Sequence, residues 1–133
     1  MADFTLDPVL VRETRFIGDL SLCRLLRYHD KTHPWLVLVP RLPDAVEIMD
    51  LPEEAQKSLM RDIVAASALL RRVAQPDKIN VGALGNIVRQ MHVHVMGRYQ
   101  SDPVWPRPLW GTTTDIFSDA EWPAEIARWQ AAL

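Results

Sequence analysis

The segment Gln90-Met91-His92-Val93-His94-Val95-Met96-Gly97-Arg98 is the most informative part of this chain, because two histidines alternate in it with apolar side chains. Alternation with a period of two is typical of a half-buried β-strand. On such a strand Gln90, His92 and His94 share one exposed face, and the residues between them point into the core. A lone histidine there is usually structural. Two in register with an amide favour a chemical role, such as metal binding, proton transfer or nucleophilic attack.

The composition sets the broad class of the protein. With 133 residues, 48% hydrophobic and 24% charged, the chain fits one globular domain spanning residues 1–133. A net charge of -2 gives no electrostatic reason to expect a nucleic-acid partner. The single cysteine, Cys23, excludes an intrachain disulfide. The stretch Met1–Phe4 lacks signal-peptide features and no apolar run is long enough to span a bilayer, so we expect a cytoplasmic protein with no membrane partner.

Four further strands are expected from apolar runs and the turn residues that bound them. A Gly-Asp pair at Gly18-Asp19 separates two apolar runs and predicts a hairpin turn within residues 14–26. Trp35–Val39 is a continuous apolar run between two prolines and predicts a well-buried strand. Lys78–Gly82 predicts a strand that leads through a glycine-containing turn into the histidine segment.

Two helices complete the expected fold. A long one starts around Asp50, which is a candidate cap, and its apolar stripe runs to about Val73. A final helix opens at Asp119 and continues through Trp129. The proline- and tryptophan-rich segment Ser101–Gly111 cannot be a regular interior strand; it could pack under the sheet, close over a site or meet a partner subunit. We therefore expect an α+β fold: an antiparallel sheet of about five strands, one long helix and a C-terminal helix.

The segment Asn80-Val81-Gly82-Ala83-Leu84-Gly85-Asn86-Ile87-Val88-Arg89-Gln90-Met91-His92-Val93-His94-Val95 resembles the histidine triad (HIT) family of nucleotide hydrolases and transferases. That family alternates three histidines with apolar residues, after a strand with a nucleotide-contacting asparagine and a turn containing glycine. Trp35–Pro40 is similar to the family's buried strand that ends in proline. The run His33–Arg41 and the tail Asp102–Gly111 are similar to a bacterial subgroup in which glutamine takes the first histidine's place. The resemblance covers residues 14 to 98 in the order of elements.

The resemblance implies a role for each matching residue. His92 falls on the middle histidine, which attacks the α-phosphate and forms a nucleotidyl-histidine intermediate. His94 falls on the third histidine, whose side chain contacts phosphate and whose backbone carbonyl holds the other ring nitrogen of the nucleophile. Gln90 takes the first position, and Asn80 falls on the amide that contacts ribose or phosphate. Asn86 is a further candidate donor to the phosphate, together with Gln90 and His94.

The chain also departs from the family pattern. Gln90 cannot relay a proton as histidine does, so the proton for the leaving group must come from His94 or water. Trp35 stands where many members place another histidine, with His33 two residues earlier. Asn86 replaces the usual glutamine, and Ile87 replaces a hydroxyl residue that contacts phosphate. Nucleotide binding is therefore a firmer expectation than fast turnover.

Two other readings stay open. A His-x-His pair chelates zinc, iron or manganese when a third ligand is near, and His29, Asp30 or His33 could supply one. A non-catalytic nucleotide-binding module is the second alternative, favoured by the altered residues around His92. We expect a HIT-like homodimer, formed through the helix 52–73 or the loop 105–110, that cleaves a nucleoside phosphoanhydride or phosphoramidate and requires no cofactor or metal.

Overall fold

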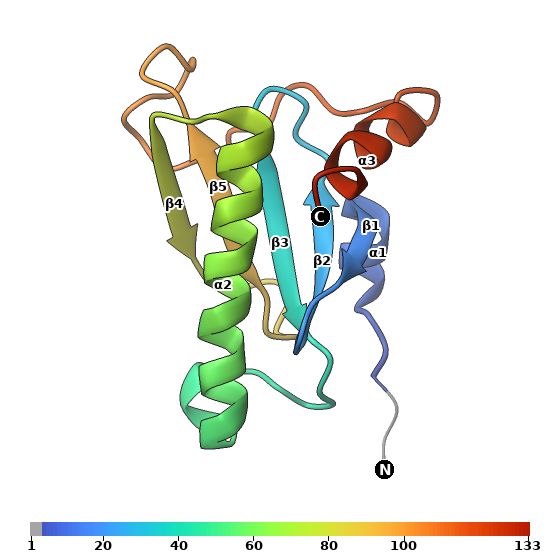
Figure 1. The fold of residues 1–133 in the computed structure, drawn as a ribbon, viewed down its shortest axis with the longest axis vertical. Helices are drawn as coiled ribbons and strands as arrows, with labels where there is room; N and C mark the ends of the chain where they lie inside the picture. The colour runs from blue at the N-terminus through green and yellow to red at the C-terminus, as the bar shows by residue number, and fades with distance from the viewer. Residues whose placement is uncertain (1–3) are drawn as a thin grey trace.

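A five-stranded antiparallel sheet in the order β1-β2-β3-β5-β4 forms the centre of the molecule in the computed structural model, which describes residues 4–133 (Figure 1). Residues 1–3, part of the N-terminal stretch without signal-peptide features, lie outside the described residues. The expected α+β class, with one long helix and a C-terminal helix, is confirmed. The elements are α1 (Pro8–Glu13), β1 (Thr14–Asp19), β2 (Cys23–Tyr28), β3 (Trp35–Pro40), the 3-10 turn η1 (Ile48–Asp50), α2 (Glu53–Ala74), β4 (Lys78–Gly82), β5 (Val93–Arg98) and α3 (Trp122–Gln130).

The neighbouring strands β3 and β5 are buried on both faces of the sheet. This corrects the expected half-buried histidine strand with one exposed face: His92 is 8% and His94 7% exposed. Regular pairing of β5 with its neighbours begins at Val93, so His92 lies immediately before the strand. The alternation of the side chains is as expected, with Val93 and Val95 in the core cluster on one face. The burial arises because chain segments cover the second face as well.

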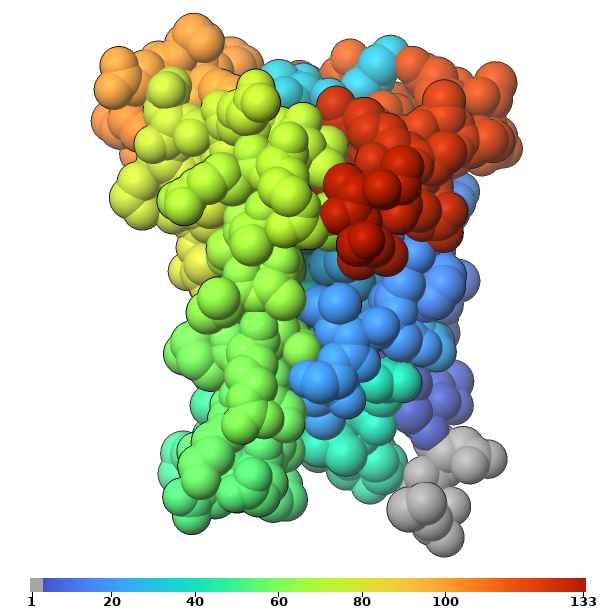
Figure 2. Space-filling model, viewed as in Figure 1, coloured from blue at the N-terminus to red at the C-terminus, as the bar shows by residue number. Residues whose placement is uncertain are grey.

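The helices α2 and α3 cover one face of the sheet, where they pack side by side (Figures 1 and 2). Leu59, Ala66, Leu69 and Leu70 form the buried stripe of α2 and pack in one cluster with the apolar residues of the sheet. The helix begins at Glu53 and not at the predicted cap: Asp50 ends the preceding 3-10 turn, and the N-cap position is taken by Pro52. Two glutamates in the first turn favour this start, because carboxylates interact well with a helix N-terminus.

The turn of the β1–β2 hairpin is held by a buried carboxylate of α2. Gly18 and Asp19, the predicted turn, still belong to β1, and the chain reverses at residues 20–22. Asp62, 3% exposed, accepts hydrogen bonds from the backbone N–H groups of Leu22 (2.9 Å) and Cys23 (2.8 Å). It also accepts bonds from the N–H (3.3 Å) and the hydroxyl (2.6 Å) of Ser21. This long-range anchor holds the turn at residues 20–22, beyond the Gly18-Asp19 position that the local sequence predicts.

The opposite face of the sheet is covered by α1 and by the segment that follows β5. Leu10 of α1 and Leu109 of that segment pack against Trp35, Val37 and other residues of this face. The short helix α1 was not predicted, although its signals are present: the Asp7 side chain accepts from the Val9 N–H, and Pro8 occupies the first turn. None of the helices within residues 4–133 is long and apolar enough to cross a membrane.

Candidate active site

A pocket of about 330 Å³ opens on the face of the sheet opposite to α2. One part of its wall is apolar and includes Val9, Leu10 and Val37. The other part carries His92 and His94 and the turn between β4 and β5. A second hollow of about 540 Å³ shares His92 and this turn and has Arg89 and Glu47 in its lining. His92 therefore stands between an apolar pocket and a more polar hollow.

The His92 ring is oriented by a backbone carbonyl. Its Nδ1 lies 2.7 Å from the carbonyl oxygen of Gln90. A carbonyl only accepts, so Nδ1 carries the proton, and in the neutral ring the lone pair is on Nε2. A carbonyl was expected to hold this ring, but the expectation named His94, and the structure corrects the residue to Gln90. The correction has a simple geometric reason, since the Gln90 carbonyl precedes the strand, where no neighbouring strand takes it into the ladder.

The His94 ring is oriented by a tryptophan of the neighbouring strand. The indole N–H of Trp35, which is 1% exposed, donates to Nδ1 of His94 over 2.9 Å. Burial of His94, together with the neighbouring His92, lowers the pKa of His94 to about 3. The two imidazoles lie edge to face with their centroids 4.9 Å apart. Hence His94 is a neutral group beside the candidate nucleophile, and it does not add a second positive charge.

The side chain of Gln90 does not line the pocket beside the two histidines. Its amide nitrogen donates to the Thr5 carbonyl (2.8 Å), and its amide oxygen accepts from the Asp7 N–H (2.8 Å). Both ends of the amide therefore tie down the segment that leads into α1. Asn86 does lie with the histidines, in the lining of both hollows. It belongs to the turn between β4 and β5, where Gly85 adopts a left-handed conformation (φ 71°).

Asn80 lies apart from the histidine pair. It is paired with Met96 across the β4–β5 ladder, and its amide oxygen accepts a hydrogen bond from Arg98 (3.0 Å). It lines a different hollow, which shares Trp110 with the pocket but contains neither histidine. The nucleotide-binding role expected for Asn80 therefore stays a prediction, and the structure does not bring Asn80 together with His92.

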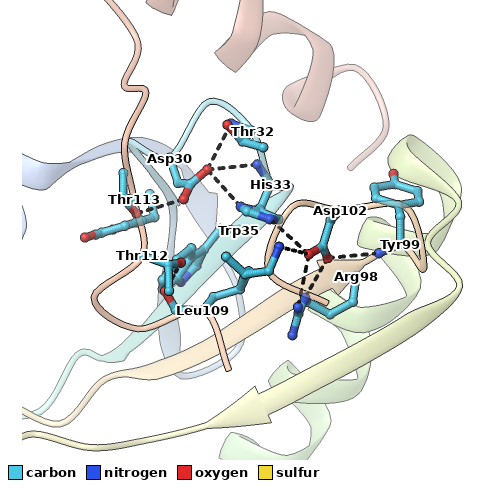
Figure 3. A network of polar contacts seen from close by, with 12 residues as sticks. Asp30, Thr32, His33, Trp35, Arg98, Tyr99, Asp102, Leu109, Thr112 and Thr113 are labelled. Atoms are coloured by element: carbon cyan, nitrogen blue, oxygen red, sulfur yellow. Dashed lines mark hydrogen bonds and ion pairs between the residues drawn. The ribbon is translucent and has the colours of Figure 1, made fainter. Parts of the chain in front are cut away.

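A buried polar network joins the segment before β3 to the loop after β5 (Figure 3). The His33 ring lies between two carboxylates, with Nδ1 3.2 Å from Asp30 and Nε2 3.7 Å from Asp102. Arg98 binds Asp102 through two nitrogens, at 2.9 and 3.2 Å. Burial opposes the ionisation of Asp102, but the hydrogen bonds from Arg98 and from backbone N–H groups outweigh it and lower the pKa of Asp102 to about 2. Asp30 also accepts from the Thr113 hydroxyl (2.7 Å), so the network anchors both ends of the loop.

That loop places Trp110 in the wall of the pocket, which is the site-closing arrangement that the sequence left open. The Trp110 ring stands edge-on to His94, with centroids 5.5 Å apart, and covers Gly82. A Cβ atom on Gly82 would lie 2.5 Å from the Trp110 ring, so only glycine leaves room for it there. Sequence reasoning did not find the contribution of α1, namely Val9, Leu10 and Glu13, or that of Tyr28 on β2. The capping signal at Asp7-Pro8 was the available clue to α1.

A metal centre of the kind considered from the sequence is not assembled. Within residues 4–133 no three histidine, cysteine, aspartate or glutamate side chains are placed to hold one ion. Asp30 and His33, considered as donors of a third ligand, lie in the network around Asp102 and not beside His92. Among the residues that the structure describes, the His-x-His pair therefore has no third protein ligand of the kind that a zinc site needs.

Comparison with known proteins gives one consistent result. The family model described as HIT domain matches residues 10–101. A histidine triad protein from Bradyrhizobium japonicum is 42% identical, with a TM-score of 0.91 over 98% of each chain. Those from Sinorhizobium meliloti (40%, TM-score 0.91, 98% of this chain and 97% of that one) and Marinobacter aquaeolei (38%, TM-score 0.92, 99% and 97%) are similarly close. A search of curated protein sequences gives no match.

Proposed function

The chain belongs to the histidine triad (HIT) family, and on this basis we propose that it binds a purine nucleotide or dinucleotide and cleaves a bond at the α-phosphate through a nucleotidyl intermediate on His92. The bond would be a phosphoanhydride or a phosphoramidate. The observation that carries the proposal is the 2.7 Å contact between His92 Nδ1 and the Gln90 carbonyl. This contact leaves the Nε2 lone pair of a neutral imidazole free to attack.

The same contact stabilises the intermediate. When Nε2 bonds to phosphorus, the electron pair of the breaking bond leaves with the departing group and the imidazole becomes cationic. The Gln90 carbonyl then accepts a charge-assisted hydrogen bond from Nδ1, which is stronger than a neutral one. Because His94 is neutral, no like charge opposes the cation 4.9 Å away.

The transferring phosphoryl group needs donors for its equatorial oxygens. The Nε2–H of His94 and the side-chain amide of Asn86 border the space in front of His92 and are suited to this role. The backbone N–H groups of the turn around Gly85 are further candidates. One preorganised donor of this kind is worth about 3 kcal/mol of transition-state stabilisation in well-studied enzymes.

The two hollows fit the two sides of such a substrate. The apolar part of the smaller pocket, with Val9, Leu10 and Val37, suits the base and ribose of the nucleoside whose phosphate is attacked. The larger hollow lies on the other side of His92 and offers the cation Arg89 to an anionic leaving group. In the second half-reaction an acceptor such as water attacks phosphorus. The N–P bond breaks, its electron pair returns to Nε2, and the proton of the water passes to solvent.

The test compares His92→Ala with the parent protein in two assays. We expect the parent to release mononucleotide from diadenosine polyphosphates, and His92→Ala to bind the nucleotide in calorimetry without releasing product. Asn80→Ala serves as a second variant, because Asn80 lies apart from the histidines. It shows whether a residue remote from His92 contributes to nucleotide binding without contributing to turnover. Binding by both proteins with turnover by neither would contradict catalysis and leave a nucleotide-binding module.

We also propose that the protein forms a homodimer, as expected from the family, and that it works in the cytoplasm. Within α2 the outward-facing Met60 and Val64 are 59% and 60% exposed, which gives this helix an apolar surface available for pairing. Light scattering on the pure protein measures the mass directly. A monomer at micromolar concentration would contradict this assembly.

A further inference from the structure

The hydrogen bond from Trp35 to His94 fixes which nitrogen of His94 carries a proton. An indole N–H can only donate, so Nδ1 of His94 must offer its lone pair, and the single proton of the neutral ring is on Nε2. Trp35 is held on the central strand β3, where it pairs with Met96 of β5 and is 1% exposed. His94 is thus restricted to donating from Nε2.

A neutral imidazole in this form is a donor but not an acid. Release of the Nε2 proton would leave an imidazolate anion, and uptake of a proton on Nδ1 would break the bond from Trp35. Burial and the neighbouring His92 also lower the pKa of His94 to about 3, so the ring stays neutral at physiological pH. The proton for a leaving group, which the sequence assigned to His94 or water, therefore does not come from His94.

The other ionisable groups of the two hollows are His92, Tyr28 and Glu13 in the pocket, and the exposed residues Glu47 and Arg89 in the larger hollow. His92 is the nucleophile. Burial raises the pKa of Tyr28 to about 12, so its phenol holds its proton. Glu13 directly precedes Thr14, the residue of β1 paired with Tyr28, and is separated from β5 by β2 and β3. None of these groups is held beside His94 in front of the phosphorus. Glu47 and Arg89 lie at the exposed edge of the larger hollow, where the proton comes from solvent and not from a buried acid.

We propose that Trp35 acts as a positioning residue that holds His94 as a permanently neutral hydrogen-bond donor, and that the site is therefore selective for phosphoanhydrides over phosphoramidates. This inference rests on the proposed function and narrows its substrate class. In an anhydride the P–O bond breaks and the electron pair leaves on a phosphate oxygen, which is a stable anion without added proton. In a phosphoramidate the P–N bond breaks, and the nitrogen must receive a proton from an acid before or as it leaves. General acid catalysis contributes roughly a hundredfold or more where it is present.

The substrate test uses a diadenosine polyphosphate and an adenosine phosphoramidate, each with the parent protein and with Trp35→Phe. We expect the parent to prefer the anhydride by about a hundredfold in kcat/KM. Trp35→Phe keeps an aromatic ring but frees Nδ1 of His94 to accept a proton. The preference should then fall by at least about tenfold, most strongly at the acidic end of the pH range, because burial and His92 still oppose the charged ring.

Trp110→Phe is the matched control. Trp110 is also a pocket tryptophan close to His94, but its indole nitrogen forms no hydrogen bond to that ring. Trp110→Phe should change the rates on the anhydride and on the phosphoramidate alike and leave their ratio unaltered. Equal rates of the parent protein on both substrates would overturn the selectivity while nucleotidyl transfer stands. Turnover of neither substrate would overturn the proposed function and the selectivity with it.

The tautomer of His94 can be read without any turnover. In protein labelled with ¹⁵N-histidine, we expect His94 to show an unprotonated Nδ1 and a protonated Nε2, with no titration down to about pH 4, in line with its pKa of about 3. In Trp35→Phe, where Nδ1 has no fixed donor, the proton should no longer be confined to Nε2, and the two nitrogen signals should move toward each other. A protonated Nδ1 in the parent, or titration near neutrality, would overturn the role of Trp35 whatever the substrate assays give.

Discussion

Substitution of Gln90 separates two roles that the sequence cannot distinguish: contact with the phosphate, and anchoring of the N-terminal segment. Its side chain forms two hydrogen bonds of 2.8 Å, to the Thr5 carbonyl and from the Asp7 N–H. Each of these hydrogen bonds contributes about 1 kcal/mol, so Gln90→Ala should weaken the docking of this segment by about 2 kcal/mol. Because α1 supplies Val9 and Leu10 to the pocket wall, up to this amount appears in binding, as a KM raised up to roughly thirtyfold.

The same variant should change kcat by less than about threefold, because the carbonyl that orients His92 belongs to the main chain and survives the substitution. Steady-state kinetics on a diadenosine polyphosphate give both constants, and hydrogen exchange of the Asp7 amide reports the loosened segment. Gln90→Met keeps the length of the side chain without the hydrogen bonds and should behave as Gln90→Ala. A hundredfold loss of kcat at unchanged KM would refute this reasoning and place the Gln90 amide on the transition state.

Three further predictions concern the frame of the site. Asp62→Asn should lower the free energy of unfolding by about 2 kcal/mol and Asp62→Ala by about 4 kcal/mol in urea titrations, because the buried N–H groups of the hairpin turn lose a charged acceptor; equal losses would contradict the account. Asp102 has a folded pKa of about 2 against 3.8 unfolded, so it contributes about 2 kcal/mol that is fully present above pH 4 and lost as pH falls toward 2. Asp102→Asn should flatten that part of the stability profile, and an unchanged profile would count against it. Gly82→Ala should displace Trp110 and raise KM about tenfold, because the added Cβ atom would clash with the indole ring. Val81→Ala, at a half-exposed neighbouring position, should leave KM unchanged. Equal KM values in the two variants would show that Trp110 does not form the pocket wall.

Local patterning was enough for most of the fold because each strand has a strong signal of its own. The run Trp35–Val39, bounded by prolines, becomes the central strand β3, and Lys78–Gly82 becomes β4 as predicted. The hairpin turn was misplaced because its position depends on Asp62, some forty residues away, and no local rule includes that carboxylate. The exposed histidine face was wrong for a related reason: the cover comes from α1 and from the loop after β5, which are distant in sequence.

Part of the candidate site was also within reach of the sequence. The spacing of His92 and His94 and the turn with Asn86 predicted groups that do meet in one pocket. The sequence could not show that the Gln90 amide turns to the N-terminal segment, because that choice depends on Thr5 and Asp7. Nor could it show that Trp35, noted as a departure from the family, supplies the hydrogen bond to His94. The hydrogen-bond partners of Gln90 and of His94 are set by the folded chain and cannot be read from residue type.

Rapid-quench trapping of the nucleotidyl adduct tests the central claim most directly. The protein is mixed with a diadenosine polyphosphate labelled at the α-phosphate, quenched in alkali to preserve N–P bonds, and digested for mass spectrometry. The account predicts an acid-labile nucleotidyl group on the peptide that contains His92, and none in His92→Asn. Product formation without an adduct, or an adduct mapped to His94, would contradict it.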